Sequence, residues 1–266
     1  MIPSFQFSPA QFLRDMKVTA DAIGAAYSEP VTRTALRAYA GSFNSGAVLW
    51  RTTDKPGDAL NNRFYERRPT DSVATAIRAG LLDPGNTMTG LISSWSSRYR
   101  GASTELCDFD AEHGFAKTWV YLGGTRPVEH VLGAPGVSWA LRRHERRFRA
   151  LGLSSVRHVA VDYRANTANL YFRTSARITW KQIERLISLA YGKPPEASVF
   201  SDMQRFTPSD GYTFSVTMAV SNGEIQRVGF YALKLPAGQF PAIGERLATF
   251  FRSAPSRDDE EMNAVA

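Results

Sequence analysis

Hydrophobic and polar residues alternate in eight short segments of the chain, and these segments fall into four pairs. Alternation that is rich in aromatic and β-branched residues predicts half-buried strands, and a short turn within a pair makes its two strands antiparallel. Asn222-Gly223 is the strongest short hairpin signal in the chain. The four expected hairpins join residues 47–53 to 61–68, 104–110 to 115–122, 156–163 to 168–173, and 212–220 to 225–234.

Longer segments with helical periodicity separate the hairpins. The expected helices cover residues 9–27, 32–40, 72–82, 87–99, 138–151, 179–191, 196–204 and 242–251. Hairpins that recur at a spacing of roughly 50 to 57 residues are typical of a structural repeat. The pattern predicts a mixed α/β (α+β) protein, an antiparallel β-barrel with solvent-facing helices outside, built from repeated helix–hairpin–helix units. We expect one domain over residues 1–255 and a disordered acidic tail over 256–266.

One face of the second strand in each hairpin combines polar and aromatic side chains, because residues two apart share a face. These faces read Arg63, Tyr65, Arg67; Lys117, Trp119, Tyr121; Asn169, Tyr171, Arg173; and Arg227, Gly229, Tyr231. Inside a barrel they would form a positively charged layer beside an aromatic one, which suits an anion with an apolar tail. Exposure of these faces to solvent is the alternative. The opposite face of the middle two strands, Thr118, Val120, Leu122 and Ala168, Leu170, Phe172, is expected to pack under helices.

Composition narrows the classes of function. The net charge is +7, and arginine supplies most of it, which favours an anionic partner: nucleic acid, a membrane surface or a small phosphorylated ligand. A lone cysteine and four histidines speak against an internal disulfide and a structural zinc site. No apolar stretch approaches the ~20 residues of a membrane span, and the N-terminus lacks a secretory pattern, so we expect a cytoplasmic protein.

Several segments, in this order and spacing, resemble one family. They are ERRPTDS, FAKTWVY, VRHVAVDYRANTANLYFR and GEIQRVGFYAL. With the helix–hairpin order, the chain is similar to the soluble ABBA aromatic prenyltransferases of the clorobiocin, novobiocin and naphterpin type over nearly its whole length. The resemblance implies a ten-stranded barrel. It also implies transfer of a dimethylallyl or geranyl group from an isoprenoid diphosphate to an electron-rich aromatic acceptor, in secondary metabolism and antibiotic biosynthesis.

The resemblance also implies roles for individual residues. The diphosphate-binding positions are Arg63, Lys117, Asn169, Arg227, Thr52 and Arg173, and the positions that line the prenyl and aromatic sites are Trp50, Tyr65, Trp119, Tyr171 and Tyr231. Arg63 stands where the magnesium-dependent branch has an aspartate. A guanidinium cannot ligate magnesium but can neutralise a diphosphate, so the resemblance implies a metal-independent enzyme without a cofactor.

The sequence also allows alternatives to an active barrel formed by a single chain. The family continues through a fifth hairpin after the position of Pro255, so this chain could be an impaired barrel that only binds a small anionic or aromatic ligand. Alternatively two chains complete each other, as a homodimer rather than a monomer, or the barrel closes with fewer strands. No catalytic residue is assigned, since water, pyrophosphate or His158 could accept the ring proton.

Two charged clusters suggest other kinds of site. The basic run from 142 to 149 could touch RNA or acidic lipid, but we interpret it as a solvated helix face, without a nucleic-acid or membrane partner. Asp108, Asp110, Glu112 and His113 lie near a predicted turn. We expect a solvated turn there rather than a metal site.

Overall fold

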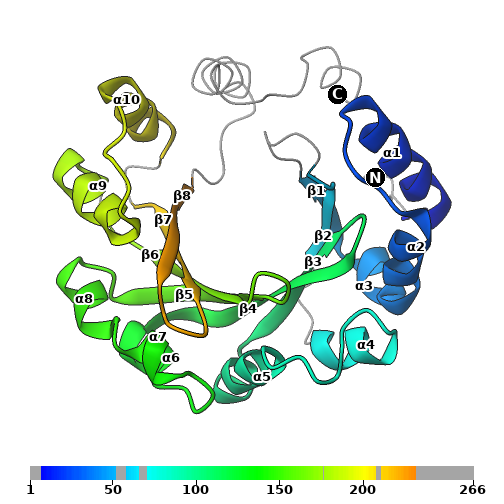
Figure 1. The fold of residues 1–266 in the computed structure, drawn as a ribbon, viewed down its shortest axis with the longest axis horizontal. Coiled ribbons are helices and arrows are strands. Elements are labelled where there is room, and N and C mark those ends of the chain that lie inside the picture. The colour runs from blue at the N-terminus through cyan, green and yellow to red at the C-terminus, as the bar shows by residue number, and fades with distance from the viewer. Residues whose placement is uncertain (1–6, 52–57, 66–70, 176, 208–210, 232–266) are drawn as a thin grey trace, which may run out of the picture. The chain divides into compact units, whose positions relative to one another are not determined.

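The computed structural model describes residues 7–51, 58–65, 71–175, 177–207 and 211–231 (Figure 1). Within this part, eight strands form one antiparallel sheet in which each strand pairs with its neighbours in the sequence, in the order β1 to β8. The strands are β1 Ala47–Arg51, β2 Asn61–Tyr65, β3 Thr104–Asp110, β4 Gly114–Pro127, β5 Ser155–Asp162, β6 Thr167–Arg173, β7 Thr213–Ala219 and β8 Ile225–Tyr231. All four predicted hairpins are confirmed within this part of the chain, while residues 52–53, 66–68 and 232–234, also predicted as strand, lie outside the described residues.

Helices lie between the hairpins as predicted. They are α1 Pro9–Ala22, α2 Glu29–Ala38, α3 Ala40–Ser45, α4 Ser72–Arg78, α5 Thr89–Arg98, α6 Val128–Leu132, α7 Trp139–Arg142, α8 Glu145–Ala150, α9 Trp180–Ile187 with the 3-10 turn η1 Ser188–Ala190, and α10 Ala197–Phe206. Two short helices were not predicted: α6, and α3, which shares only Ala40 with the helix expected over 32–40. Five or six residues carry too little periodicity. The helix expected over 242–251 and the tail over 256–266 lie outside the described residues.

The chain divides into two compact units. Of the described residues, those within 7–86 and 105–118 belong to unit 1 and those within 87–104 and 119–231 to unit 2, so the division crosses β4 between Thr118 and Trp119. Each unit has its own core.

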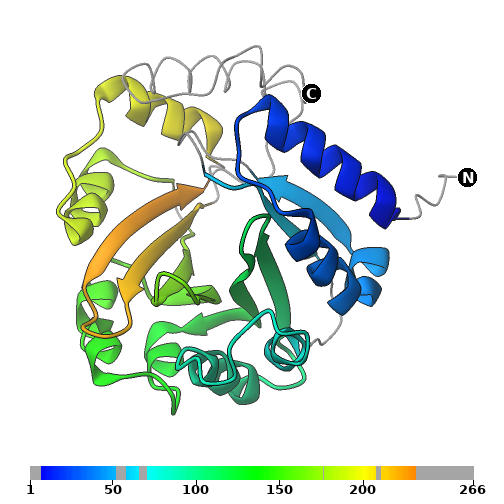
Figure 2. The same cartoon turned by 45° about the vertical axis from the view of Figure 1, so that its right-hand side comes forward.

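The core of unit 1 is aromatic. Tyr39 of α2–α3 stacks on Phe115 of β4 at 6.1 Å between ring centroids, and Phe43 of α3 contacts Phe64 of β2 at 5.4 Å. The hydroxyl of Tyr39 donates a 2.6 Å hydrogen bond to the carbonyl of Ser72, where α4 begins. Helices α1 to α3 therefore lie on one side of the unit 1 strands, as Figures 1 and 2 show.

In unit 2, the helices cover the face of the sheet predicted for them. Ala168, Leu170 and Phe172 are fully buried, and the ring of Phe172 lies 5.4 Å from that of Phe148 on α8. Helices α5 to α8 lie along that side of the strands (Figures 1 and 2). Val120 and Leu122 of β4 are equally buried, and so is Thr118 in unit 1. This part of the sequence prediction is confirmed.

The segment expected as one helix over 138–151 forms two helices, α7 and α8. The break falls at Arg143 and His144, whose side chains both reach the turn between β7 and β8. His144 Nε2 lies 2.7 Å from the carbonyl oxygen of Gly223, and Arg143 donates to the carbonyl of Asn222 at 3.1 Å. A Cβ at Gly223 would lie 2.0 Å from the carbonyl oxygen of Ala140, so only glycine permits this close approach.

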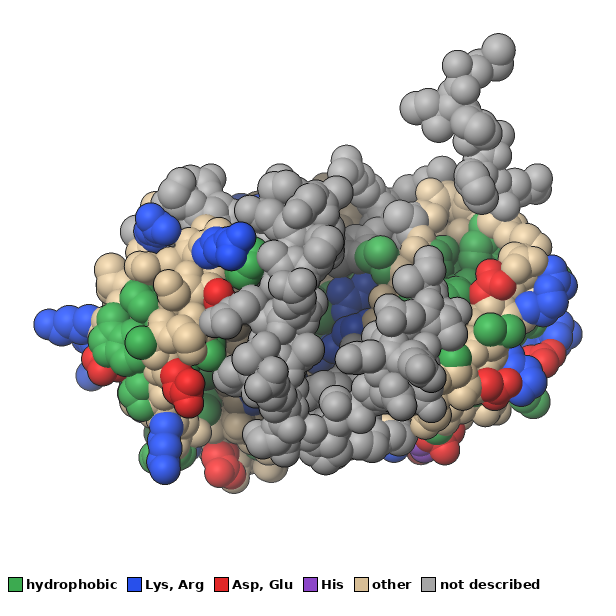
Figure 3. Space-filling view, turned by 90° about the horizontal axis from the view of Figure 1, so that it is seen from above, with side chains coloured by type: hydrophobic (Ala, Val, Ile, Leu, Met, Phe, Trp, Pro, Cys, Tyr) green, Lys and Arg blue, Asp and Glu red, His purple; other side chains and the backbone are tan. Residues whose placement is uncertain are grey.

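Charges of both signs share the outer surface. On α1 and α2, Lys17 pairs with Asp21 and Arg33 with Glu29, each one helical turn apart. Figure 3 shows such mixed charges on its right-hand side, over these helices. Among the described helices, none has both the length and the apolar character needed to cross a membrane.

Candidate active site

The register of β5 to β8 aligns the predicted site residues of unit 2 in three rows, because directly paired residues share a face. The first row contains Asn169, Thr217 and Arg227. The second contains His158, Tyr171, Ser215 and Gly229, and the third contains Arg173, Thr213 and Tyr231. This face is opposite to Leu170 and Phe172, which pack under helices. The alternation predicted from sequence therefore brings these residues together.

Aromatic rings cluster over the second row. Trp119 of β4 lies 4.4 Å from the ring of Tyr171, and Tyr231 lies 5.7 Å from it on the other side. His158 contacts both Tyr121, at 5.2 Å, and Tyr171, at 6.5 Å. We call Trp119, Tyr121, His158, Tyr171 and Tyr231 the aromatic array. Ring faces attract cations and exclude water, so the array suits an apolar or cationic group.

The first row can hold an anion. The side-chain amide of Asn169 is buried and donates through Nδ2 to Thr217 Oγ1 at 2.6 Å, while its Oδ1 has no partner among the described residues. Because Thr217 accepts this bond, its own hydroxyl proton is directed to another acceptor. Arg227, opposite Thr217, is exposed and forms no ion pair with a described residue. Sequence reasoning missed Thr217, although its alternation with Thr213 and Ser215 was a usable signal.

In unit 1, Arg63 is held by a carboxylate. Its guanidinium forms a two-pronged ion pair with Asp108, with Nη2 to Oδ2 at 2.6 Å, and the two residues are direct partners on β2 and β3. The side chains are 19% and 6% exposed, so the pair is largely removed from solvent. The expectation that Asp108 belongs to a solvated turn is therefore wrong. The pair could not be predicted from the sequence, because alternation indicates on which face of a strand a side chain lies but not how two distant strands align.

The rest of that acidic cluster does form an exposed turn. Asp110 accepts hydrogen bonds from the backbone N–H groups of Glu112 and His113 at 2.8 and 3.0 Å. These three side chains lie within reach of one another, and Glu112 and His113 are exposed. Asp side chains commonly accept backbone N–H groups in this way within turns.

A cavity of about 170 Å³ adjoins the ion pair, and its lining consists of Leu49, Trp50, Arg51, Asn61, Asn62, Arg63 and Asp108. Leu49 and Arg51 pair with Arg63 and Asn61, and therefore share the face of the ion pair. The amide of Asn62 is buried, and neither of its polar atoms has a partner among the described residues. Buried amides are normally hydrogen-bonded, so this one marks a place for water or a polar ligand.

Trp50 lies on the other face of β1. It pairs with Asn62, and its ring lies 5.7 Å from that of Phe12 on α1. Trp50 and Arg63 therefore lie on opposite faces of the paired strands, yet both line the cavity beside the ion pair. The contact of Trp50 with the prenyl group stays a prediction. The two residues that share the face of Arg63 are Leu49 and Arg51.

Four other residues predicted for the site are Lys117, Arg173, Tyr65 and Thr52. Lys117 is half-buried in the unit 1 part of β4, and Arg173 is half-buried at the end of β6 opposite Thr213. Tyr65 ends β2, two residues after Arg63, and only its strand position is described. Thr52 lies outside the described residues.

Several arginines of the basic run have local structural roles. Arg142 donates to the carbonyl of Ala134 at 2.9 Å, Arg143 to that of Asn222, and Arg149 lies 3.6 Å from Glu145. Helix ends and loops expose such carbonyls, and basic side chains satisfy them. These bonds account for the positions of the three arginines.

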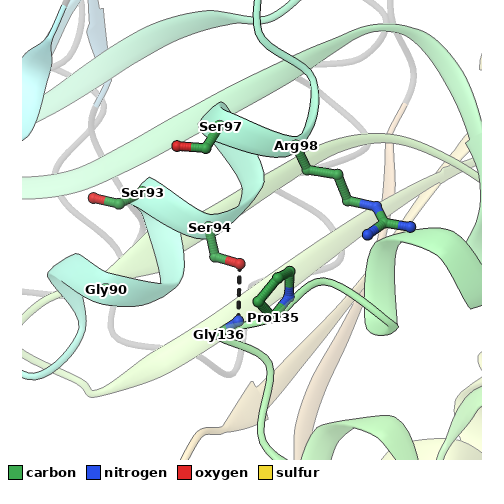
Figure 4. A pocket seen from close by; sticks show the side chains of 7 residues that line it. All are labelled: Gly90, Ser93, Ser94, Ser97, Arg98, Pro135 and Gly136. Atoms are coloured by element: carbon green, nitrogen blue, oxygen red, sulfur yellow. Dashed lines mark hydrogen bonds between the residues drawn. The ribbon is translucent and has the colours of Figure 1, made fainter.

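A larger cleft, of about 600 Å³, lies between α5 and the segment around Pro135 and Gly136 (Figure 4). Ser94 Oγ accepts a 2.9 Å hydrogen bond from the backbone N–H of Gly136, which ties the two walls together. Ser93, Ser97 and Arg98 also line the cleft and are exposed. None of the residues predicted for the site lines it, so volume alone does not identify the site.

Comparison with known proteins identifies the family. The aromatic prenyltransferase Orf2 family matches residues 7–266. An aromatic prenyltransferase from Sclerotinia sclerotiorum is 52% identical over 98% of this chain and 86% of that protein. One from Botryotinia fuckeliana is 49% identical over 99% and 87%. A 4-hydroxyphenylpyruvate 3-dimethylallyltransferase from Streptomyces niveus is 40% identical over 98% and 80%.

The chain belongs to the aromatic prenyltransferase Orf2 family, the ABBA type. It is an aromatic prenyltransferase, an enzyme that transfers prenyl groups to aromatic acceptors. The family resemblance read from the sequence is confirmed.

Proposed function

We propose that this enzyme transfers a dimethylallyl or geranyl group from an isoprenoid diphosphate to an electron-rich, phenolic acceptor, without magnesium. The observation that carries the proposal is the succession of rows in unit 2, where an anion-binding row adjoins an aromatic array. A relative 40% identical to this chain is named for dimethylallyl transfer to a phenol, which supports both the donor and the acceptor class.

The sheet is proposed to be the wall of a closed barrel within a single domain over residues 1–255. Family membership supports closure, and so does the pairing of every described strand with its neighbours in the sequence. In such a barrel the polar and aromatic face lines the lumen, while the face with Phe172 and Leu170 carries the helices.

The diphosphate binds at the first row. Arg227 supplies positive charge, Thr217 donates its hydroxyl proton, and Asn169 holds that hydroxyl in a donating orientation through its 2.6 Å bond. Preorganised donors aimed at developing negative charge are typically the largest contribution to catalysis of this kind. The family resemblance adds Arg63, Lys117, Arg173 and Thr52 to the same task.

The prenyl group then lies against the aromatic array. When the allylic C–O bond breaks, the electron pair leaves with pyrophosphate and an allylic cation remains. The rings of Trp119, Tyr171 and Tyr231 stabilise this cation and keep water from it. A ring carbon of the acceptor attacks the cation, and loss of one ring proton restores aromaticity.

His158 is proposed as one acceptor for that proton, with water and pyrophosphate as the alternatives. Its imidazole lies within the array, in contact with Tyr121 and Tyr171. A neutral imidazole takes up a proton near physiological pH, which matches the need of this step.

The donor set supports transfer without magnesium. Magnesium binds through carboxylate oxygens and water, and the carboxylate of Asp108 is engaged by both prongs of the Arg63 guanidinium. These residues as arranged do not fit the ion. By the family resemblance, Arg63 corresponds to the position at which the magnesium-dependent branch has its metal-binding aspartate.

Mass spectrometry tests the proposal directly. The purified enzyme is incubated with dimethylallyl or geranyl diphosphate and a panel of phenols that includes 4-hydroxyphenylpyruvate, once with EDTA and once with magnesium. We expect a product heavier by one prenyl unit in both cases. A product that requires magnesium would overturn the metal-independent part, and a folded enzyme that binds the donor but forms no product would favour the impaired, ligand-binding barrel.

A further inference from the structure

The side chain of Tyr231 lies over the second row, next to the first row at which the diphosphate is proposed to bind. Its ring is 5.7 Å from Tyr171, and its hydroxyl accepts a 3.3 Å hydrogen bond from Ser215, a residue of the second row. Tyr231 itself belongs to the third row, so its side chain leans back by one row toward the diphosphate end. Two anchors, a ring contact and a hydrogen bond, hold it there.

Gly229 makes this position possible. A Cβ at Gly229 would lie 2.9 Å from Ser215 Oγ, 3.3 Å from Tyr231 Cε2 and 3.5 Å from the Tyr231 hydroxyl. The phenol ring therefore lies over the backbone of Gly229, in space that a side chain would otherwise take. A larger residue here would push the ring of Tyr231 away from Ser215.

Strand geometry sets the length that remains. Rows two residues apart are about 6.8 Å apart, since a strand rises about 3.4 Å per residue. A prenyl chain whose diphosphate is bound at Arg227 and Thr217 therefore has a length of roughly one row spacing available before it meets the Tyr231 ring. With single bonds of about 1.5 Å, a dimethylallyl group extends roughly 4 to 5 Å and a geranyl group roughly 9 to 10 Å.

The aromatic rings of the second row direct the prenyl chain of the donor toward Tyr231. On that side of the first row lie Tyr171 and the other rings, whereas on the opposite side β6 and β7 end in Thr167 and Ala219. An allylic cation needs the ring faces, so the donor points its carbon chain at the second row.

We propose that Tyr231, seated over Gly229, limits the donor to five carbons, so that this enzyme uses dimethylallyl diphosphate and excludes geranyl diphosphate. The inference rests on the proposed function, because it assumes the diphosphate at the first row. It selects one of the two donors that the family resemblance leaves open.

Steady-state kinetics with both donors tests the limit. We expect wild type to prefer dimethylallyl diphosphate, and Tyr231→Ala to raise the geranyl-to-dimethylallyl ratio of kcat/KM by roughly 10- to 100-fold, the range that small changes in apolar fit produce. Tyr231→Phe keeps the ring and should keep the low ratio. Phe230→Ala is the matched control, because Phe230 packs against Phe214 at 4.9 Å on the other face of β8. An unchanged ratio in a folded, active Tyr231→Ala enzyme would overturn the inference, and so would equal use of both donors by wild type.

Donor binding without an acceptor separates this inference from the proposed function. Calorimetric titration uses the unreactive thiolodiphosphate analogues of both donors, with Tyr231→Leu as a second opening variant should Tyr231→Ala fail to fold. Absence of binding by both analogues to wild type would contradict the proposed function itself. Binding of the dimethylallyl analogue to wild type, with the geranyl analogue gained only in the opened variant, supports the limit. Equally tight binding of both analogues to wild type would refute the limit alone.

Discussion

The two units present positive charge in different ways. In unit 1 the guanidinium of Arg63 is fixed against the buried carboxylate of Asp108, so the pair carries no net charge. In unit 2 the guanidinium of Arg227 is exposed, forms no ion pair with a described residue and is opposite the neutral Thr217. A compensated cation is held in a defined place but adds little net field, whereas an uncompensated one retains its full attraction for an anion.

This difference divides the expected consequences of mutation. Loss of one member of the Arg63–Asp108 pair leaves a charge in a poorly solvated place, so folding stability suffers first. Loss of Arg227 removes charge from an exposed position, so ligand binding and turnover suffer while stability does not. Variants of Asp108, Arg63 and Arg227 test this division.

Asp108→Ala is expected to reduce the free energy of unfolding by about 3 kcal/mol or more, because breaking a buried ion pair strands the remaining charge. Asp21→Ala is the matched control, since it removes an exposed ion pair with Lys17 worth about 0.3–0.5 kcal/mol. Urea unfolding of both variants measures the difference.

The double variant Arg63→Gln with Asp108→Asn sharpens this test. It removes both charges together, so we expect it to recover much of the stability that Asp108→Ala loses. If Asp108→Ala were no less stable than Asp21→Ala, the pair would contribute nothing to the fold, and the contrast between the units would fail.

Arg227→Ala is expected to lower kcat/KM about 100-fold, comparable to the loss of one preorganised donor at a developing negative charge. Its melting temperature should stay close to that of wild type, because the side chain is exposed. Arg146→Ala on α8 removes the same charge from another exposed position and serves as the control. Donor kinetics and thermal unfolding together decide the outcome: full activity in Arg227→Ala would remove this residue from the site.

The alternation of residues predicted much of this arrangement. Period-2 segments gave the hairpins, and the same period assigned Asn169, Tyr171, Trp119 and Tyr231 to a face opposite to the buried Leu170. These features are local, because the two faces of a strand follow from neighbouring residues alone. They needed no knowledge of which strand lies beside which.

Register and long-range contacts were not available from the same pattern. The Arg63–Asp108 pair depends on how β2 aligns with β3, and the pairing of Trp50 with Asn62 depends on how β1 aligns with β2. A shift of one residue in either strand register would reverse the faces. The break between α7 and α8 depends on a carbonyl 79 residues away in the sequence, at Gly223. Such features are set by tertiary packing, which helical periodicity does not encode.

The smallest expected effect concerns how unit 2 holds the hairpin that carries Arg227 and Thr217. His144 is buried against the turn of that hairpin, and burial lowers its pKa. The hydrogen bond to the Gly223 carbonyl acts in the opposite direction, and Arg143 and Arg147 nearby add to the lowering, which is the net direction. Folding therefore favours the neutral imidazole, whereas the unfolded chain takes up a proton near the ordinary pKa of about 6.5. Stability should fall as pH drops below that value, toward the lowered pKa of the folded state.

Thermal unfolding between about pH 5 and pH 7.5 measures this dependence in the range where histidine titrates. His144→Gln keeps a side-chain N–H that can donate to the carbonyl of Gly223 but cannot titrate, so its melting temperature should change less with pH than that of wild type. His130→Gln, on the exposed side of α6, should leave the wild-type dependence intact. A dependence that persists unchanged in His144→Gln would show that another group is responsible. In that case the attachment of the β7–β8 turn would not respond to pH, and unit 2 would present Arg227 equally well across the range.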